Sequence, residues 1–209
     1  MVVLKPPNLH PKPISQHARE TFTSPTAPTW CKRVLTDPSL IPISTLSREP
    51  KTSTEDSLFA ETLATRHTIA AWQSFYRHLP QTTAQTRNDS EPPAGELVAL
   101  LALGRGVNGH TDTAHGGILA AILDNLMGLT MSLYQSPGTA GYTVYMTVRF
   151  KRPLRTPGAV LCRGWLEEGR SGGRKLFVRG TVEDGEGGVF AEGEGLWVEV
   201  PEGRMRERL

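Results

Sequence analysis

One segment, residues 116–134, is apolar on nearly every side of the helix that its residue types predict. A surface helix carries its apolar residues on one stripe, so a helix apolar all round is expected to be buried. The segments around it predict strands at residues 96–103, 142–151, 159–168, 175–183 and 188–200. An antiparallel sheet curved around the helix is the simplest packing that covers it, and the sequence therefore predicts an α+β fold.

Glycine and proline divide the chain near residue 95. None of the 21 glycines precedes Gly95, whereas 12 of the 16 prolines do. We therefore expect the main domain to cover residues 95–202, with residues 203–209 as a tail. Residues 1–50 are rich in Pro, Ser and Thr and show no hydrophobic periodicity, so they predict an extended, largely irregular arm.

Residues 51–94 predict a helix followed by a linker. Ser53 and the acidic residues after it are typical of a helix N-terminus, and apolar residues then recur at roughly helical spacing until Pro80. The polar run 81–93 is the expected linker.

Composition excludes several classes of protein. The formal net charge is +2, from 23 basic and 21 acidic residues, so the chain lacks the large excess of positive charge that nucleic-acid binding needs. Asp124 and Asn125 interrupt the apolar segment, which is too short to span a membrane. Cys31 and Cys162 lie far apart and outside any metal-binding spacing, as expected for buried thiols or a reducing, cytoplasmic location. A basic start without acids before Glu20 leaves a mitochondrial location open, although its prolines break the helix that such targeting needs.

Three further motifs are better explained by turns or an incomplete site. The glycines of 104–109 match GxGxxG, but no βαβ unit comes after them. The GxSxG run around Ser171 is followed by a predicted strand where a nucleophile elbow needs a helix. His110, Asp112 and His115 share one loop, but no further ligand lies close in sequence, so we expect no metal and no cofactor.

The run His115-Gly116-Gly117, followed by Asp124 within the apolar helix, has a chemical rationale. Backbone N–H groups at a glycine-rich helix start form an oxyanion hole, and a carboxylate among apolar residues is expected to face a cleft. Alternatively, Asp124 bonds to a neighbouring strand and the glycines only permit tight packing. Eight residues of helix separate Gly116 from Asp124 by roughly 12 Å, so a site that uses both requires two chains related by a twofold axis.

The run from Asn108 through His115-Gly116-Gly117 to Asp124, with residues 143–150 and Lys151-Arg152-Pro153-Leu154, resembles the hotdog-fold acyl-CoA thioesterases. The resemblance is strongest to their phenylacetic-acid-type branch and covers about residues 95–200. It implies a sheet wrapped around the long helix, a homodimer or dimer of dimers, and sites at the subunit interface. It also implies that Asp124 acts on water or attacks the thioester, that the Gly116 N–H polarises the carbonyl, and that Thr143 places the water or carboxylate. Asn108 corresponds to a further polar residue of some family members.

The remaining candidate residues have alternative roles. His115 is expected to orient the helix start rather than to transfer protons. Gly117 lets the substrate approach the backbone, and Lys151, Arg152 and Arg174 are candidate partners of the coenzyme A phosphates, or else ordinary surface charge. The expected activity is hydrolysis of an acyl-CoA or acyl-carrier thioester. A hotdog dehydratase or hydratase, or a non-catalytic acyl-binding module, is the alternative.

Overall fold

The computed structural model describes residues 6–79 and 95–202. Its main sheet has seven strands in the order β1-β2-β3-β7-β8-β9-β6, and all neighbouring strands are antiparallel. They are β1 (Leu40–Ile43), β2 (Ile69–His78), β3 (Gly95–Leu103), β6 (Thr139–Phe150), β7 (Gly158–Leu166), β8 (Lys175–Glu183) and β9 (Val189–Pro201). The other elements are α1 (Gln16–Thr23), α2 (Thr29–Thr36), α3 (Gly116–Ser132), the short helical turns η1 (Leu46–Arg48), η2 (Leu58–Thr62) and η3 (Arg105–Val107), and a small hairpin of β4 (Asn108–His110) and β5 (Thr113–Ala114).

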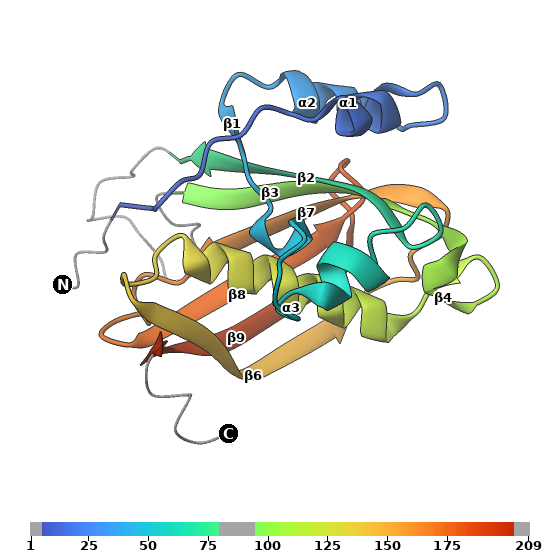
Figure 1. Ribbon diagram of the computed structural model, residues 1–209. Helices are drawn as coiled ribbons and strands as arrows, with labels where there is room; N and C mark the ends of the chain where they lie inside the picture. Colours follow the sequence, from blue (N-terminus) through green and yellow to red (C-terminus); the bar gives the residue numbers. More distant parts are fainter. Residues whose placement is uncertain (1–5, 80–94, 203–209) are drawn as a thin grey trace.

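Helix α3 lies along the inner side of the curved sheet and contacts β3, β6, β7, β8 and β9 (Figure 1). Its buried residues include Ile122, Leu123, Leu126 and Met127, none of which is measurably exposed. The predictions of a buried helix and of an antiparallel sheet around it are confirmed, and the strands predicted after residue 95 are present.

A row of glycines lets the helix approach the sheet closely. Gly164, Gly180 and Gly193 are paired across β7, β8 and β9. A Cβ atom would lie 2.3 Å from the Thr130 hydroxyl at Gly164, and 3.1 Å and 3.0 Å from Met127 at the other two. Side chains in this row would push α3 away from the sheet.

The helix predicted between residues 53 and 79 is wrong for most of its length. Only η2 is helical, as a single π-helical turn, and Ile69–His78 forms strand β2. Trp72 and Tyr76 face the core around α3, whereas Ala71 and Phe75 face the opposite side, under the N-terminal helices. A strand buried on both faces is apolar at odd and even positions, so its spacings also fit a helix. The predicted linker 81–93 and tail 203–209 lie outside the described residues.

The prediction of an irregular N-terminal arm is also wrong. Helices α1 and α2 form a layer over the outer face of the sheet (Figure 1), where Phe22, Trp30 and Cys31 pack with Phe75 and other apolar residues of β2 and β3. Each helix has only eight residues, a length that depends on tertiary packing rather than on a strong periodic signal. Strand β1 then adds an edge to the sheet, where the missing N–H of Pro42 is tolerated.

The glycine-rich motifs form turns, as predicted. Ser171 is 4% exposed in the β7–β8 connection, and its hydroxyl accepts a hydrogen bond from the Phe177 N–H across 2.9 Å. The N–H groups of Gly104 and Gly106 donate to the carbonyls of Thr68 and His67. Within the described ranges, no helix is both long and apolar enough to cross a membrane.

Candidate functional site

The first group of candidate residues gathers where α3 begins. His115 is the N-cap, and its Nδ1 accepts a hydrogen bond from the Gly117 N–H across 2.9 Å. An accepting Nδ1 requires the proton of the neutral ring to sit on Nε2. This bond orients the helix start, and the N–H of Gly117, the glycine predicted to let the substrate approach the backbone, is already bonded within the chain.

The Gly116 N–H has no hydrogen-bond acceptor among the residues that the structure describes. It belongs to the first turn of α3, where N–H groups point away from the helix along the positive end of its dipole. The ring of Phe150 lies against this glycine, 3.4 Å from the position that a Cβ would occupy. Phe150 is itself 56% exposed, so the N–H sits beside an apolar surface that is open to solvent in the single chain.

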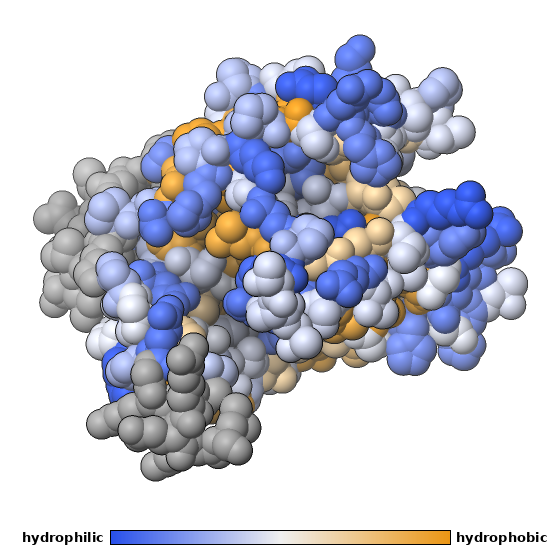
Figure 2. Space-filling model, in the orientation of Figure 1, coloured by the Kyte–Doolittle hydropathy of each residue, from blue (hydrophilic) through white to orange (hydrophobic). Residues whose placement is uncertain are grey.

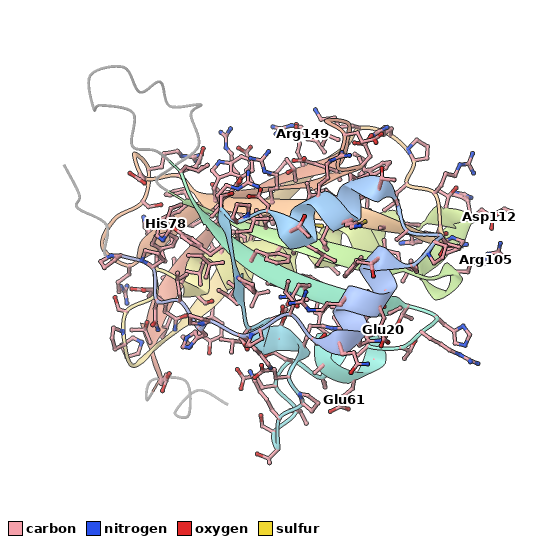
Figure 3. All side chains as sticks on the ribbon, turned by 90° about the horizontal axis from the view of Figure 1, so that it is seen from above. Glu20, Glu61, His78, Arg105, Asp112 and Arg149 are labelled. Atoms are coloured by element: carbon pink, nitrogen blue, oxygen red, sulfur yellow. The ribbon has the colours of Figure 1, made fainter. Side chains whose placement is uncertain are left out.

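Asn108 lies at the same end of the helix, in the β4–β5 hairpin. Its side-chain oxygen accepts a hydrogen bond from the Thr156 hydroxyl, which ties the hairpin to the loop after β6. The exposed pair Arg105 and Asp112 flanks this end of the molecule, with 3.7 Å between Nε and Oδ1 (Figure 3). The amide oxygen of Asn108 thus already accepts one hydrogen bond within the chain.

The second group lies two helical turns further along α3. Asp124 is partly buried on an otherwise uncharged helix, and its Oδ1 accepts a hydrogen bond from the Thr143 hydroxyl across 3.0 Å. The second carboxylate oxygen receives no donor from any described residue. It remains able to accept a proton or to attack a carbon atom.

A β-bulge at Val144 places Thr143 beside the helix. The β6–β9 register pairs Thr143 with Trp197 and Tyr145 with Leu196, which leaves Val144 as an extra residue. The simple alternation predicted from the sequence puts Thr143 on the face opposite Met146. The bulge reverses the alternation, so that Thr143 contacts Asp124 while Met146 also packs against the core.

Asn125 lies next to Asp124, and no role for it was predicted from the sequence. Its side-chain amide donates to the Ser47 hydroxyl across 3.0 Å and so holds η1 beside the helix, next to Asp124. The one feature of the sequence that pointed to Asn125 is that it is a second polar residue, next to Asp124, in an otherwise apolar stretch of the helix. Its partner lies 78 residues away in sequence, in a segment expected to be irregular.

The basic residues do not form one cluster within the chain. Lys151 pairs with Glu192 across 2.7 Å, and Arg152 pairs with Asp184 and covers the Phe190 ring. The hydrogen bond from Arg152 lowers the pKa of Asp184 to about 2. Arg174 lies at the opposite end of the sheet, beside the start of β8, roughly 25 Å away along the strands. Lys151 and Arg152, which follow β6, thus each form an ion pair with an acidic residue. The exposed Arg174 has no ion-pair partner in the described part of the chain.

Within one chain, the two groups stay apart. Gly116 and Asp124 are eight residues apart on a continuous helix, so roughly 12 Å separates them along its axis. In residues 6–79 and 95–202, no three His, Cys, Asp or Glu side chains are grouped so as to hold a metal ion.

Comparison with known proteins identifies relatives of this domain. The thioesterase superfamily matches residues 111–191, which run from the loop before α3 to β9. "Verlamelin biosynthesis protein B" of Lecanicillium sp is 28% identical over 181 residues, covering 73% of this chain and 75% of the relative.

Solved structures also align with the chain. A thioesterase from Haemophilus influenzae covers 74% of this chain and 94% of its own, with 14% identity and a TM-score of 0.49. A phenylacetic acid degradation-related protein from Ralstonia eutropha covers 49% and 75%, with 21% identity and a TM-score of 0.45. The buried helix wrapped by an antiparallel sheet is the hotdog arrangement, and residues 111–191 of the domain are similar to the thioesterase superfamily.

Proposed function

We propose that this protein hydrolyses acyl-CoA or acyl-carrier thioesters. The observation that carries the proposal is the Asp124 carboxylate, oriented by Thr143 on an apolar helix and left with one free oxygen. The second requirement, a donor for the developing oxyanion, is met by the unpaired Gly116 N–H at the helix start.

The reaction needs no group beyond these residues, a water molecule and the thioester. In one route, Asp124 takes a proton from water while the water oxygen attacks the thioester carbon. In the other, the carboxylate itself attacks and water then hydrolyses the mixed anhydride. In both routes the C–S bond breaks, the thiolate sulfur takes up a proton, and the products are a carboxylic acid and a thiol.

The site is completed by a second copy of the chain. Strand β6 is one edge of the sheet and exposes Tyr142, Val144, Tyr145 and Phe150, which are 39–56% accessible. A long apolar edge strand is a surface that proteins normally pair or cover. Two chains related by a twofold axis, with their α3 helices antiparallel, bring Asp124 of one to the Gly116 N–H of the other.

The similarity to a verlamelin biosynthesis protein supports a role in biosynthesis. We propose that the thioester is an intermediate of a biosynthetic route, presented by coenzyme A or by a carrier protein. Pantetheine is the part common to both, so acyl-pantetheine thioesters are suitable probes.

Mixing two inactive variants tests the shared site. Asp124→Asn removes the carboxylate, and Gly116→Pro removes the N–H at the first helical position, where proline is tolerated. The backbone of His115 is extended (φ −67°, ψ 134°), as a residue before proline requires. Each variant alone should be inactive, whereas their heterodimer contains one intact site.

After co-refolding, random mixing should restore about one quarter of the wild-type activity. No recovery, despite heterodimers detected by mass spectrometry, would show that the site is not shared. Thiol release from the acyl-pantetheine panel, compared with hydration of an enoyl thioester, separates hydrolysis from the dehydratase or hydratase alternative.

A further inference from the structure

Five exposed basic residues gather at the end of the molecule where α3 begins. Figure 2 shows hydrophilic surface there, over the β4–β5 hairpin. Two of the five precede β2, one lies in η3, one in β4 and one in the loop after β6. We call them the hairpin patch: Arg66, His67, Arg105, His110 and Arg155.

Hydrogen bonds hold the segments that carry the hairpin patch side by side. The Gly106 N–H donates to the His67 carbonyl across 2.6 Å, which joins η3 to the residues before β2. Thr113 of the hairpin forms an isolated β-bridge with Arg155 and accepts a hydrogen bond from its guanidinium across 3.3 Å. The patch is therefore one surface, although its members come from distant parts of the sequence.

The hairpin patch is cationic because its arginines have few acidic partners. The Arg105 side chain is 73% exposed, and its Nε lies 3.7 Å from Oδ1 of Asp112. Within residues 6–79 and 95–202, Asp112 is the one acidic residue that forms an ion pair with the patch. Arg66 donates to the ring of His67, and Arg155 to a hydroxyl group. Three guanidinium groups against one carboxylate leave the patch positive, and an ion pair this exposed is weak.

The hairpin patch adjoins the helix start that carries the candidate oxyanion donor, the Gly116 N–H. The two residues before α3, Ala114 and His115, donate their N–H groups to the carbonyls of Leu154 and Val107 across 2.9 and 2.8 Å. Leu154 directly precedes one patch arginine, and Val107 lies two residues after another. The group that presents a thioester to the helix start therefore passes beside the patch.

The form of the hairpin patch suits an acidic protein better than a nucleotide. Sites for small molecules are concave and enclose most of the ligand. All five patch residues are instead exposed, and Figure 3 shows Arg105 at the margin of the molecule. Exposed charges of one sign attract an oppositely charged macromolecule and raise its rate of association.

We infer that the hairpin patch docks an acidic acyl-carrier protein, whose pantetheine-linked thioester then reaches the helix start. The inference rests on the proposed thioester hydrolysis, and it identifies a carrier protein rather than free coenzyme A as the preferred thioester donor. The matching surface on the carrier is rich in Asp and Glu around the serine that bears the pantetheine arm. Arg105 and Arg155 pair with these carboxylates, since guanidinium groups bind carboxylates with two hydrogen bonds.

The test compares one acyl group on three donors. The probes are octanoyl thioesters of a small acidic carrier protein of fatty-acid synthesis, of coenzyme A and of pantetheine. In about 50 mM salt, kcat/KM should be at least about tenfold higher for the carrier thioester than for the other two, and about 500 mM salt should remove most of this advantage. The comparison needs only the wild-type protein.

Reversing two charges tests the hairpin patch itself. Arg105→Glu combined with Arg155→Glu should lower the ratio of kcat/KM for the carrier thioester to that for the pantetheine thioester by about 30-fold, mainly through KM. Arg19→Glu combined with Lys32→Glu is the matched control. It makes the same change in net charge at exposed positions of α1 and α2 and should leave the ratio unchanged.

Three results would overturn the inference. They are equal kcat/KM for the three donors at low salt, a higher value for coenzyme A than for the carrier protein, and an equal loss in the control pair. Binding of the carrier protein loaded with a non-hydrolysable thioether analogue, measured by calorimetry, repeats the comparison without catalysis. Binding that depends on Arg105 and Arg155, without any hydrolysis, would overturn the proposed function and leave the docking surface standing.

Discussion

The hydroxyl of Thr143 donates a hydrogen bond to Oδ1 of Asp124 across 3.0 Å, which joins strand β6 to helix α3. The contact holds one carboxylate oxygen and leaves the other free of described donors. Thr143 is thereby the candidate positioning residue, and Asp124 is the candidate catalytic residue.

Replacing Asp124 by asparagine should lower kcat for the best thioester by roughly 100-fold or more. Asparagine keeps the shape of the side chain but has no carboxylate to accept a proton or attack carbon. Binding of a thioether analogue should persist. The exposed Glu20 on α1 provides a matched control, since Glu20→Gln should leave turnover unchanged (Figure 3). Near-normal hydrolysis by Asp124→Asn would make Asp124 a structural carboxylate.

Replacing Thr143 by valine should lower kcat by about tenfold with little change in KM, because water replaces only part of the positioning contact. Thr143→Ser retains the hydroxyl group and should restore most of the turnover. Thr147→Val, at an exposed position of the same strand, should have no effect. If Thr143→Ser were as impaired as the valine variant, the hydroxyl group would not be the feature that matters.

Phe22→Ala should lower the free energy of unfolding by about 3–5 kcal/mol, because this residue of α1 is only 1% exposed and packs against the sheet. Chemical denaturation followed by circular dichroism measures this change. Leu58→Ala, at a side chain that is 50% exposed, should cost far less. Deletion of residues 1–50 should yield poorly soluble protein, since it uncovers the apolar outer face of β2 and β3. A soluble truncated protein with an unchanged unfolding midpoint would show that this layer is dispensable.

Both cysteines should resist an aromatic disulfide reagent at pH 8 in the folded protein. Burial raises the pKa of the Cys31 thiol to about 11 and that of Cys162 still further, and the thiolate is the reactive form. Unfolding in guanidinium returns both thiols to ordinary values near about 8.5, where both should react within minutes. Rapid reaction of either thiol in the folded state would contradict this burial.

Several elements could be predicted from local sequence because a single physical requirement determines them. The apolar segment beginning at Gly116 had to be buried on all sides, and the alternating segments after it had to form an antiparallel sheet. The residues after Ser171 alternate as in a strand, and not as in the helix that a nucleophile elbow needs. The run around Ser171 was therefore predicted to be a turn. Each of these signals lies within a short stretch of the chain.

Other features depend on partners distant in sequence. The segment Ile69–His78 has the spacing of a helix, and only the layers on both of its faces, around α3 and under α1 and α2, make it a strand. The basic residues separate because β6 and β8 both run antiparallel to β9, which places Arg174, before β8, and Lys151, after β6, at opposite ends of the sheet.

The sequence by itself determined the buried helix, the antiparallel sheet and the positions of Gly116 and Asp124 along that helix, because helical spacing and burial are local properties. The tertiary structure decided which side chain meets the carboxylate. Only the pairing of β6 with β9 creates the bulge at Val144 that turns Thr143 towards Asp124, and only the folded N-terminal segment brings Ser47 to Asn125. Both depend on register between strands and on packing between distant segments, which local residue patterns do not encode.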